Sequence, residues 1–415
     1  MKRRQLLALT GMLAPMVAAG LGCQRGLSTC DITQDACQQD IYSHVLSLRG
    51  DGYDPYAGLP PIKVISEDAY RQQLEQEQAA PANSHPTAWD RALALLHFTA
   101  PTTVPESPDG GAGIDAGNGT SAIDDEVTHV YAFYDPAAKN VTVIDHSGHT
   151  GNTDPTIPMV SLAHELVHSL QDRELDLKKA DYQTTDAYFA YDTIIEGDAR
   201  FYEYLFENDL NHLGFSQTTV DKIPDQELEY EFTNFDKLGS PLFAARSLVY
   251  ALGAKYEATA YHAGGNAAIR HGYAKEPQRM VGFLVGPDGR APAVGSGDVC
   301  PAPQTESLPT AGNTVGADQF GALLFYTFMR GWNVDHDVAF PVAQAWTGDF
   351  LRVQANADAS TVAVAWRIEL SMPFPAQVVQ TLGATKELEV TAVGNTVEIK
   401  ASDSTTITWH AVSCQ

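Results

Sequence analysis

The residues best suited to chemistry stand in one short stretch, His164-Glu165-Leu-Val-His168. On a helix, residues four apart lie on the same face, so His164 and His168 can present two imidazoles to one point. Imidazole nitrogens are common Zn²⁺ ligands, and Glu165 would lie where a base can deprotonate a zinc-bound water. The spacing therefore predicts a catalytic zinc site with two histidine ligands and a glutamate base.

The residues around the two histidines favour this interpretation over a chance match. Apolar residues recur there at three- and four-residue spacing, at Leu162, Leu166, Val167 and Leu170. This spacing predicts a helix with one buried side. Pro158 lies just ahead of it, where proline is tolerated at a helix start.

A catalytic zinc ion keeps three protein ligands and one open position, so two histidines need a third partner. Glu196 is the candidate, 28 positions beyond the second histidine (196 − 168 = 28) and on the amphipathic segment 186–206. Gly197 beside it would let two helices approach closely, which would explain a glycine in a helix interior. The alternative is that Glu196 is a surface acid, but the two isoleucines before it favour a position that faces the interior.

Two segments rich in β-forming residues, 127–134 and 140–144, come directly before the predicted zinc helix. The turn signal Asp135-Pro136 between them predicts a β-hairpin. His146 and His149 follow in a loop, and we favour a solvated loop there over an accessory metal site.

The motif His-Glu-Leu-Val-His168, together with Ile-Ile-Glu196-Gly-Asp-Ala, resembles that of the gluzincin metallopeptidases. The wider frame, Ala163 to Arg173, is similar to a group of exported bacterial proteins predicted to be such peptidases. The resemblance covers residues 127–206. It implies that His164, His168 and Glu196 are zinc ligands, that Glu165 is the base, and that the hairpin supplies a strand along which an extended substrate binds.

One position departs from the thermolysin-like pattern, in which an aspartate follows the ligand glutamate by four residues. Position 200 is an arginine here. We therefore expect the hydrogen bond that orients His164 to come from Asp198 or Asp192. The resemblance also implies a later Tyr or His that stabilises the oxyanion, and four residues downstream remain open for this role: Tyr261, His262, His271 and Tyr273.

The net charge of −26 and a sequence pI near 4.7 argue against nucleic acid or anionic lipid headgroups as partners through simple electrostatics. The basic and apolar N-terminus predicts an export signal over residues 1–22. Gly22-Cys23 resembles the end of a bacterial lipoprotein signal. We favour a lipid on Cys23 over plain secretion after cleavage near Ala18-Ala19-Gly20.

The remaining cysteines form an even set, which in an exported protein suggests two disulfides. A local bridge between Cys30 and Cys37 and a long-range bridge between Cys300 and Cys414 is the simplest of the three pairings, and the sequence does not choose among them.

The expected fold is α+β and zincin-like, mainly helical, with a β-hairpin ahead of the zinc helix and a small β-rich C-terminal tail. We expect a signal peptide at 1–22, a polar tether at 23–60, a metallopeptidase domain at 61–370 and the tail at 371–415. Within the domain, residues 101–123 read as a flexible insertion. A second hairpin is predicted over 386–401.

The expected function is zinc-dependent hydrolysis of peptide bonds in a peptide or protein substrate, by an exported, lipid-anchored enzyme. Two alternatives remain open. One is a surface lipoprotein that uses the zincin fold for binding, although a degenerate site often loses its base and this chain keeps Glu165. The other is a zinc amidase that acts on cell-wall material.

Overall fold

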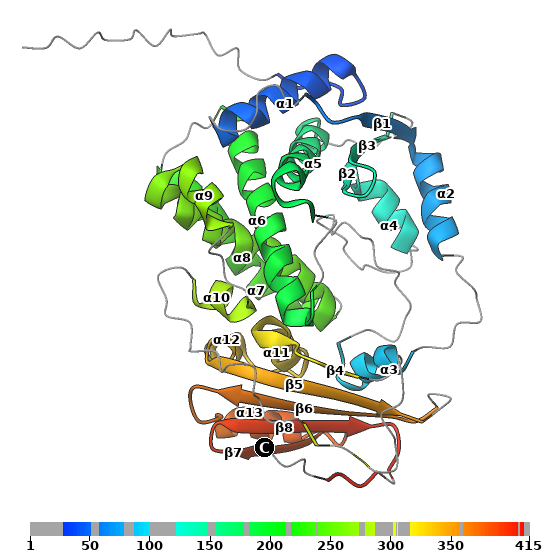
Figure 1. Ribbon diagram of the computed structural model, residues 1–415, viewed down its shortest axis with the longest axis vertical. Coiled ribbons are helices and arrows are strands. Elements are labelled where there is room, and N and C mark those ends of the chain that lie inside the picture. The colour runs from blue at the N-terminus through cyan, green and yellow to red at the C-terminus, as the bar shows by residue number, and fades with distance from the viewer. Residues whose placement is uncertain are drawn as a thin grey trace, which may run out of the picture.

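The computed structural model describes residues 28–50, 58–78, 87–98, 122–147, 154–177, 182–212, 217–237, 240–273, 279–286, 302–303, 305, 316–356, 360–405 and 407–410. Helices form the centre of the molecule, with a small sheet at one end and a larger sheet at the other (Figure 1). The α+β class, the helical majority and the hairpin ahead of the helix that carries His164 and His168 are confirmed. Signal residues 1–22, Cys23, His149 and residues 101–121 of the insertion lie outside the described residues.

Three long helices pack side by side at the centre: α5 (Thr156–Leu175), α6 (Thr185–Leu210) and α8 (Pro241–Gly264). Helices α6 and α8 begin with N-caps, since the hydroxyls of Thr184 and Ser240 accept the N–H of Ala187 and Phe243. The left-handed backbone of Asp176 (φ 52°) ends α5. Two further helices lie beside this group, α7 (Gln217–Asn234) and α9 (Asn266–Gly272).

The small sheet has the strand order β1-β3-β2, with β1 (Ile62–Ser66) parallel to β3 (Asn140–Asp145) and β2 (Ala132–Asp135) antiparallel at one edge. The predicted hairpin is therefore present. Its first strand is shorter than expected, because residues 127–129 belong to the helix α4 (Ala122–His129). That helix and α2 (Glu67–Gln78) cover the sheet, and Val127 is buried against Tyr70 and Ile144. Tertiary packing thus outweighs the β propensity of these residues.

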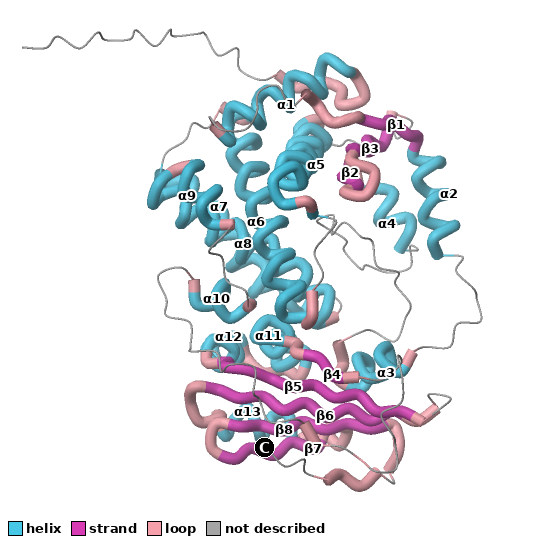
Figure 2. The backbone as a smooth tube through the Cα atoms, in the orientation of Figure 1, coloured by secondary structure: helices cyan, strands magenta, loops and turns pink. Residues whose placement is uncertain are grey.

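The larger sheet is antiparallel with the order β4-β5-β6-β8-β7 (Figure 2). Its strands are β4 (Ala317–Asp318), β5 (Trp346–Ala355), β6 (Val362–Leu370), β7 (Glu389–Val393) and β8 (Thr396–Ser402). The helices nearest to it are α3 (Ala88–Leu95), α10 (Met280–Val285), α11 (Gly321–Gly331), α12 (His336–Gln344) and α13 (Ala376–Gly383). The hairpin predicted over 386–401 is confirmed as β7 and β8. Because β8 pairs with β6, the expected boundary at 371 falls inside this sheet.

The segment expected to be a tether contains a helix, α1 (Asp35–Arg49), which packs on α5 and α6. Its buried face includes Ile41 and Val45, and its last residue, Arg49, is fully buried. The Cys30–Cys37 disulfide closes a short loop at its start, which is the local bridge among the pairings that the sequence left open. The sequence did not predict this helix, because its few buried apolar residues stand among many polar ones. Cys300 and Cys414 lie outside the described residues.

Two large hydrophobic clusters meet at the middle of α6. Residues of α6 up to Ile195 pack in the cluster that includes the large sheet, while residues from Ala199 onward pack in the cluster that includes α1, α5 and the small sheet. Glu196 and Gly197 lie between these two groups. The predicted third ligand is therefore at the junction of two cores. None of the described helices is long and apolar enough to cross a membrane.

Candidate metal centre

Helix α5 places the two histidines and the glutamate of the motif as predicted. His164, Glu165 and His168 are 8%, 9% and 9% exposed. One helical turn separates the two imidazoles, and their Nε2 atoms lie 3.0 Å apart. The spacing has therefore brought two potential ligand atoms to one point inside the protein.

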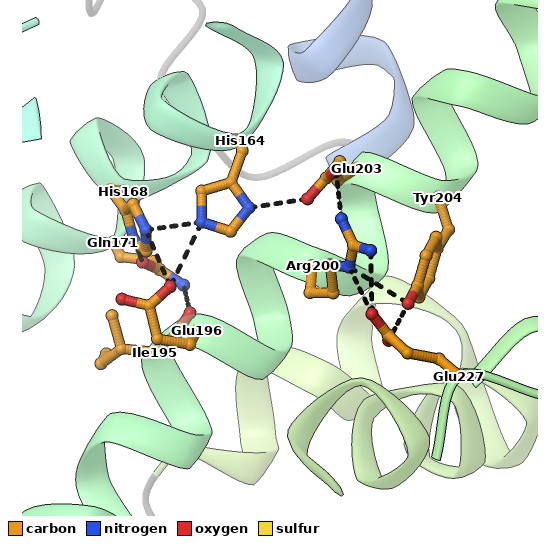
Figure 3. A network of polar contacts seen from close by, with 9 residues as sticks. All are labelled: His164, His168, Gln171, Ile195, Glu196, Arg200, Glu203, Tyr204 and Glu227. Carbon is orange, nitrogen blue, oxygen red and sulfur yellow. Dashed lines mark hydrogen bonds and ion pairs between the residues drawn. The ribbon is translucent and has the colours of Figure 1, made fainter. Parts of the chain in front are cut away.

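Helix α6 brings the third predicted ligand to the same point. Oε2 of Glu196 lies 3.2 Å from Nε2 of His164 and 3.4 Å from Nε2 of His168 (Figure 3). Ligand atoms arranged tetrahedrally about 2.0–2.1 Å from a zinc ion lie about 3.3 Å from one another. The three observed separations, 3.0 to 3.4 Å, fit that arrangement.

The other ring nitrogens fix which atoms carry protons. Nδ1 of His164 lies 2.9 Å from Oε2 of Glu203, and Nδ1 of His168 lies 2.8 Å from Oε1 of Gln171. Both oxygens are acceptors, so each ring donates its Nδ1–H, and Nε2 is the nitrogen that carries the lone pair when the ring is neutral. Both Nε2 atoms therefore face the Glu196 carboxylate oxygen and can serve as metal ligands. A cation at their centre would satisfy all three.

The residues that orient the histidines differ from those expected. Glu203, not Asp198 or Asp192, holds His164, seven residues and two helical turns beyond Glu196. Asp198 instead accepts the Nε2–H of Gln171 at 2.8 Å, and so lies on the His168 side of the site. Asp192 lines the cavity beside the site, where burial and the nearby Glu196 raise its pKa to about 8.

Arg200 supports the carboxylate of Glu203 from the side away from His164. Its guanidinium donates to Glu203 and, at 2.8 Å, to Glu227 of α7 (Figure 3). Burial alone would raise the pKa of Glu203, but Arg200 and His164 lower it to about 2. Glu203 is therefore a carboxylate, and its Oε2 accepts a hydrogen bond from Nδ1–H of His164.

The two imidazoles and the Glu196 carboxylate shift one another's pKa values. Burial alone would lower the pKa of His164, but Glu196 and Glu203 raise it to about 10. For His168 the attraction of Glu196 likewise outweighs burial and raises the pKa to about 9. Burial would raise the pKa of Glu196, yet the two imidazoles hold it well below its ordinary value. The site thus attracts positive charge, which suits a divalent cation.

Glu165 lies beside the ligands but is turned toward the small sheet. Its Oε2 accepts the backbone N–H of Tyr134, on the edge strand β2, at 2.8 Å. Ligand atoms of Glu165 and the two histidines all lie within 4.8 Å of one another. Burial raises the pKa of Glu165. A carboxylate near the ligands, with a raised pKa, has the features of a general base.

The ligands and Glu165 line a cavity of about 650 Å³. Its walls carry several tyrosines from α6, α8, β2 and nearby loops: Tyr131, Tyr134, Tyr182, Tyr188, Tyr191 and Tyr250. The cavity is large enough for several residues of a peptide or a ligand of similar size.

Tyr250 of α8 is the functional candidate that the sequence reasoning missed. Its ring centroid lies 6.1 Å from that of His164, and its hydroxyl hydrogen-bonds Glu196. Burial and the adjacent carboxylates raise its pKa well above the ordinary value, so the hydroxyl keeps its proton. Its only sequence signal is Gly253, three residues later, which packs against Gly197 of α6.

Of the four residues predicted as oxyanion donors, Tyr261, His262 and Tyr273 do not line the cavity. Tyr273 instead donates to Asp198. The side chain of His271 lies outside the described residues. Tyr261, His262 and Tyr273 therefore have no contact with the cavity in the described structure.

His146, considered for an accessory metal site, has partners of another kind. Its Nε2 lies 3.0 Å from the backbone oxygen of Val130, and its Nδ1 lies 3.4 Å from Glu67. Its ring also packs on Tyr131. These contacts join the loop after β3 to α2 and to the segment between α4 and β2, so His146 has a structural role.

Comparison of the chain with protein-family models, with curated proteins and with solved structures finds no match. The interpretation of the site therefore depends on its own geometry and chemistry.

Proposed function

We propose that this protein is a zinc-dependent metallopeptidase of the gluzincin type, with His164, His168 and Glu196 as ligands. The observation that carries the proposal is the convergence of two Nε2 atoms and one carboxylate oxygen at 3.0 to 3.4 Å, while both Nδ1 protons are donated elsewhere. The ligand set of two histidines and a glutamate is typical of catalytic zinc, which keeps a fourth position for substrate or water.

Zinc, when bound, would polarise the scissile carbonyl as a Lewis acid. Glu165 would take the proton of the attacking water and later pass it to the leaving amine, a role that its raised pKa favours. Tyr250 would donate its hydroxyl proton in a hydrogen bond to the carbonyl oxygen as negative charge develops there. The burial of these groups supports the proposal, since electrostatic interactions are stronger away from water.

The edge strand β2 supports a peptide as the substrate. The N–H of Tyr134 points to Glu165 and away from β3, and the Tyr134 hydroxyl donates to Asp172 of α5 at 2.5 Å, which fixes the strand on the zinc helix. Backbone groups alternate along an antiparallel strand, so those of Ala132 point away from β3 as well. Because Ala132 lines the cavity, an extended peptide could form main-chain hydrogen bonds there.

The test is metal content and cleavage of a peptide library, compared between the wild type and Glu165→Gln. Glu174→Gln is the matched control, because it makes the same change on the same helix at an exposed residue that pairs with Arg270. We expect zinc in all three proteins, cleavage by the wild type and Glu174→Gln, and a loss of at least about 10²-fold in Glu165→Gln.

A wild type without zinc, or equal cleavage by the wild type and Glu165→Gln, would refute the proposal. Zinc binding without peptide cleavage would support one of the alternatives, which cell-wall fragments as substrates can separate. Release of fragments would indicate an amidase, and no release would indicate a binding protein.

Export and a lipid on Cys23 remain part of the proposal. The Cys30–Cys37 disulfide supports export, because disulfides persist in oxidising compartments. Mass spectrometry of the mature N-terminus tests this part. A lipidated Cys23 is the expected result, and an intact Met1 would refute it.

A further inference from the structure

We propose that Arg49, the last residue of α1, is a positioning residue for the metal ligand His168, acting through Asp198 and Gln171. The inference rests on the proposed metal site and concerns what holds that site in shape. Four residues from three helices form the connection, and we call it the Arg49 relay: Arg49, Asp198, Gln171 and His168.

The relay is an unbroken series of hydrogen bonds. Arg49 donates from Nη1 to Oδ2 of Asp198 at 2.7 Å. The same Oδ2 accepts Nε2–H of Gln171 at 2.8 Å. Oε1 of Gln171 then accepts Nδ1–H of His168 at 2.8 Å. A charge on α1 is thus connected to a metal ligand on α5 through a carboxylate and an amide.

The amide of Gln171 fixes which atom of the relay accepts a hydrogen bond from His168. Its Nε2 donates both to Asp198 and to the backbone oxygen of Ile195, at 2.8 Å each. With both donors used on one side, the oxygen must face His168 and can only accept. With a metal bound, His168 would therefore carry its proton on Nδ1 and direct the Nε2 lone pair to the metal.

Arg49 supplies the positive charge that pairs with Asp198. Neither side chain of this ion pair is exposed to solvent. A buried carboxylate without a cationic partner would be strongly disfavoured. Tyr273 donates to the same oxygen, so the negative charge of Asp198 has donors from three sides.

The position of Arg49 is itself fixed by the end of α1. Its guanidinium lies 4.4 Å from the ring centroid of Tyr202 and donates to the Tyr273 hydroxyl at 3.1 Å. The side chain of Asn266 bridges Tyr202 to the backbone oxygen of Leu48. The docked helix α1 therefore delivers the charge to one defined place.

The test measures zinc affinity, by competition with a chromophoric chelator, in the wild type, Arg49→Met, Gln171→Met and the double variant. Partners that orient a ligand typically contribute 10- to 100-fold in metal affinity. We expect each single variant to lose about 10- to 100-fold, and the double variant to lose no more than the larger single loss, because both changes interrupt one series of contacts.

Arg270→Met is the matched control, since it removes an arginine that is 30% exposed and pairs with Glu174 on the surface. It should bind zinc as the wild type does. Absorption of the Co²⁺-loaded proteins gives a second readout, because the visible bands of cobalt report ligand geometry. The bands should shift in Arg49→Met and stay unchanged in Arg270→Met.

Arg49→Lys, which keeps the charge, replaces Arg49→Met if the latter does not fold, and it should have intermediate affinity. Zinc affinity within twofold of the wild type in the folded Arg49 variant, or fully additive losses in the double variant, would overturn the relay. Absence of zinc from the wild type would instead refute the metal site, so the two failures are distinguishable.

Discussion

Gly197 of α6 and Gly253 of α8 face each other with no room for a side chain between them. A Cβ atom on Gly197 would lie 2.2 Å from Cα of Gly253, and a Cβ atom on Gly253 would lie 2.0 Å from the backbone oxygen of Thr193. The two helices therefore touch backbone to backbone. Glu196 and Tyr250 are the neighbours of this contact, which explains how they reach the same cavity.

Gly253→Ala should destabilise the protein, because the added methyl group would force α6 and α8 apart. Overpacking of this kind typically costs about 1–3 kcal/mol, and a backbone obstacle allows little relief. Denaturant unfolding measures the change. Gly383→Ala is the control, because nothing lies within 4 Å of a Cβ there. An equal effect of the two substitutions would contradict the interpretation of the contact.

Removal of zinc should lower the melting temperature, since zinc would bind the folded state through three atoms that only the folded chain brings together. A ligand at a hundredfold excess over its Kd stabilises the folded state by about 2.7 kcal/mol. Calorimetry of chelator-treated protein, with and without added zinc, provides the measurement. Glu196→Gln should show a smaller response to zinc. If zinc stabilises the wild type and Glu196→Gln equally, Glu196 is not a ligand.

Tyr250→Phe should lower kcat by about 10²- to 10³-fold, the usual effect of removing one oxyanion donor. KM and zinc content should change little, because the ring remains in place. Tyr250 could act on the substrate or support the ligand Glu196, which it contacts. Steady-state kinetics combined with a metal assay distinguishes these two roles. A loss of zinc with unchanged kcat in the loaded protein would show that Tyr250 serves the ligand and not the substrate.

Stability should fall as the pH rises from about 4 to 7, because of two buried carboxyls. Burial raises the pKa of Asp186 to about 7, with a contribution from Asp349, and burial raises the pKa of Asp349 to about 6. In the unfolded chain both pKa values are about 3.9. The folded state therefore binds more protons between these limits, and the stabilisation present at low pH is lost as the pH passes the folded pKa values.

Asp186→Asn should flatten this dependence, because an amide does not titrate and can still accept the N–H of Met280. Between pH 5 and pH 8 the free energy of unfolding of the two proteins should change by amounts that differ by a few kcal/mol at most, at about 1.4 kcal/mol per pKa unit. Urea unfolding at pH 5 and pH 8 compares the two proteins. The same pH dependence in both would show that Asp186 is not responsible.

The sequence predicts those parts of the site that depend on local geometry. His164 and His168 follow from helical spacing, and Glu196 from the next amphipathic helix. Glu203 could also have been found, since seven residues after Glu196 is the same helix face. Tyr250 could not, because its position depends on the contact of Gly253 with another helix.

The same distinction holds for the fold. Helices α5 and α6 and the hairpins β2–β3 and β7–β8 have strong periodic patterns and were predicted. Helices α1 and α4 were not, because what makes them helical is the surface on which they pack. Arg49 in particular is a charged residue in a polar segment, and only its ion pair with Asp198 reveals its importance.

The partners of Asp198 also set an order of events during biosynthesis. In a chain synthesised from its N-terminus, all three proposed ligands are present once residue 196 has emerged. The contacts around Asp198, however, join Arg49 to Tyr273, 224 positions apart. Between these two points the nascent chain would carry the ligands without the complete support of His168. Tight zinc uptake would therefore be a late step, which would keep a nascent hydrolase inactive until its central helices have assembled.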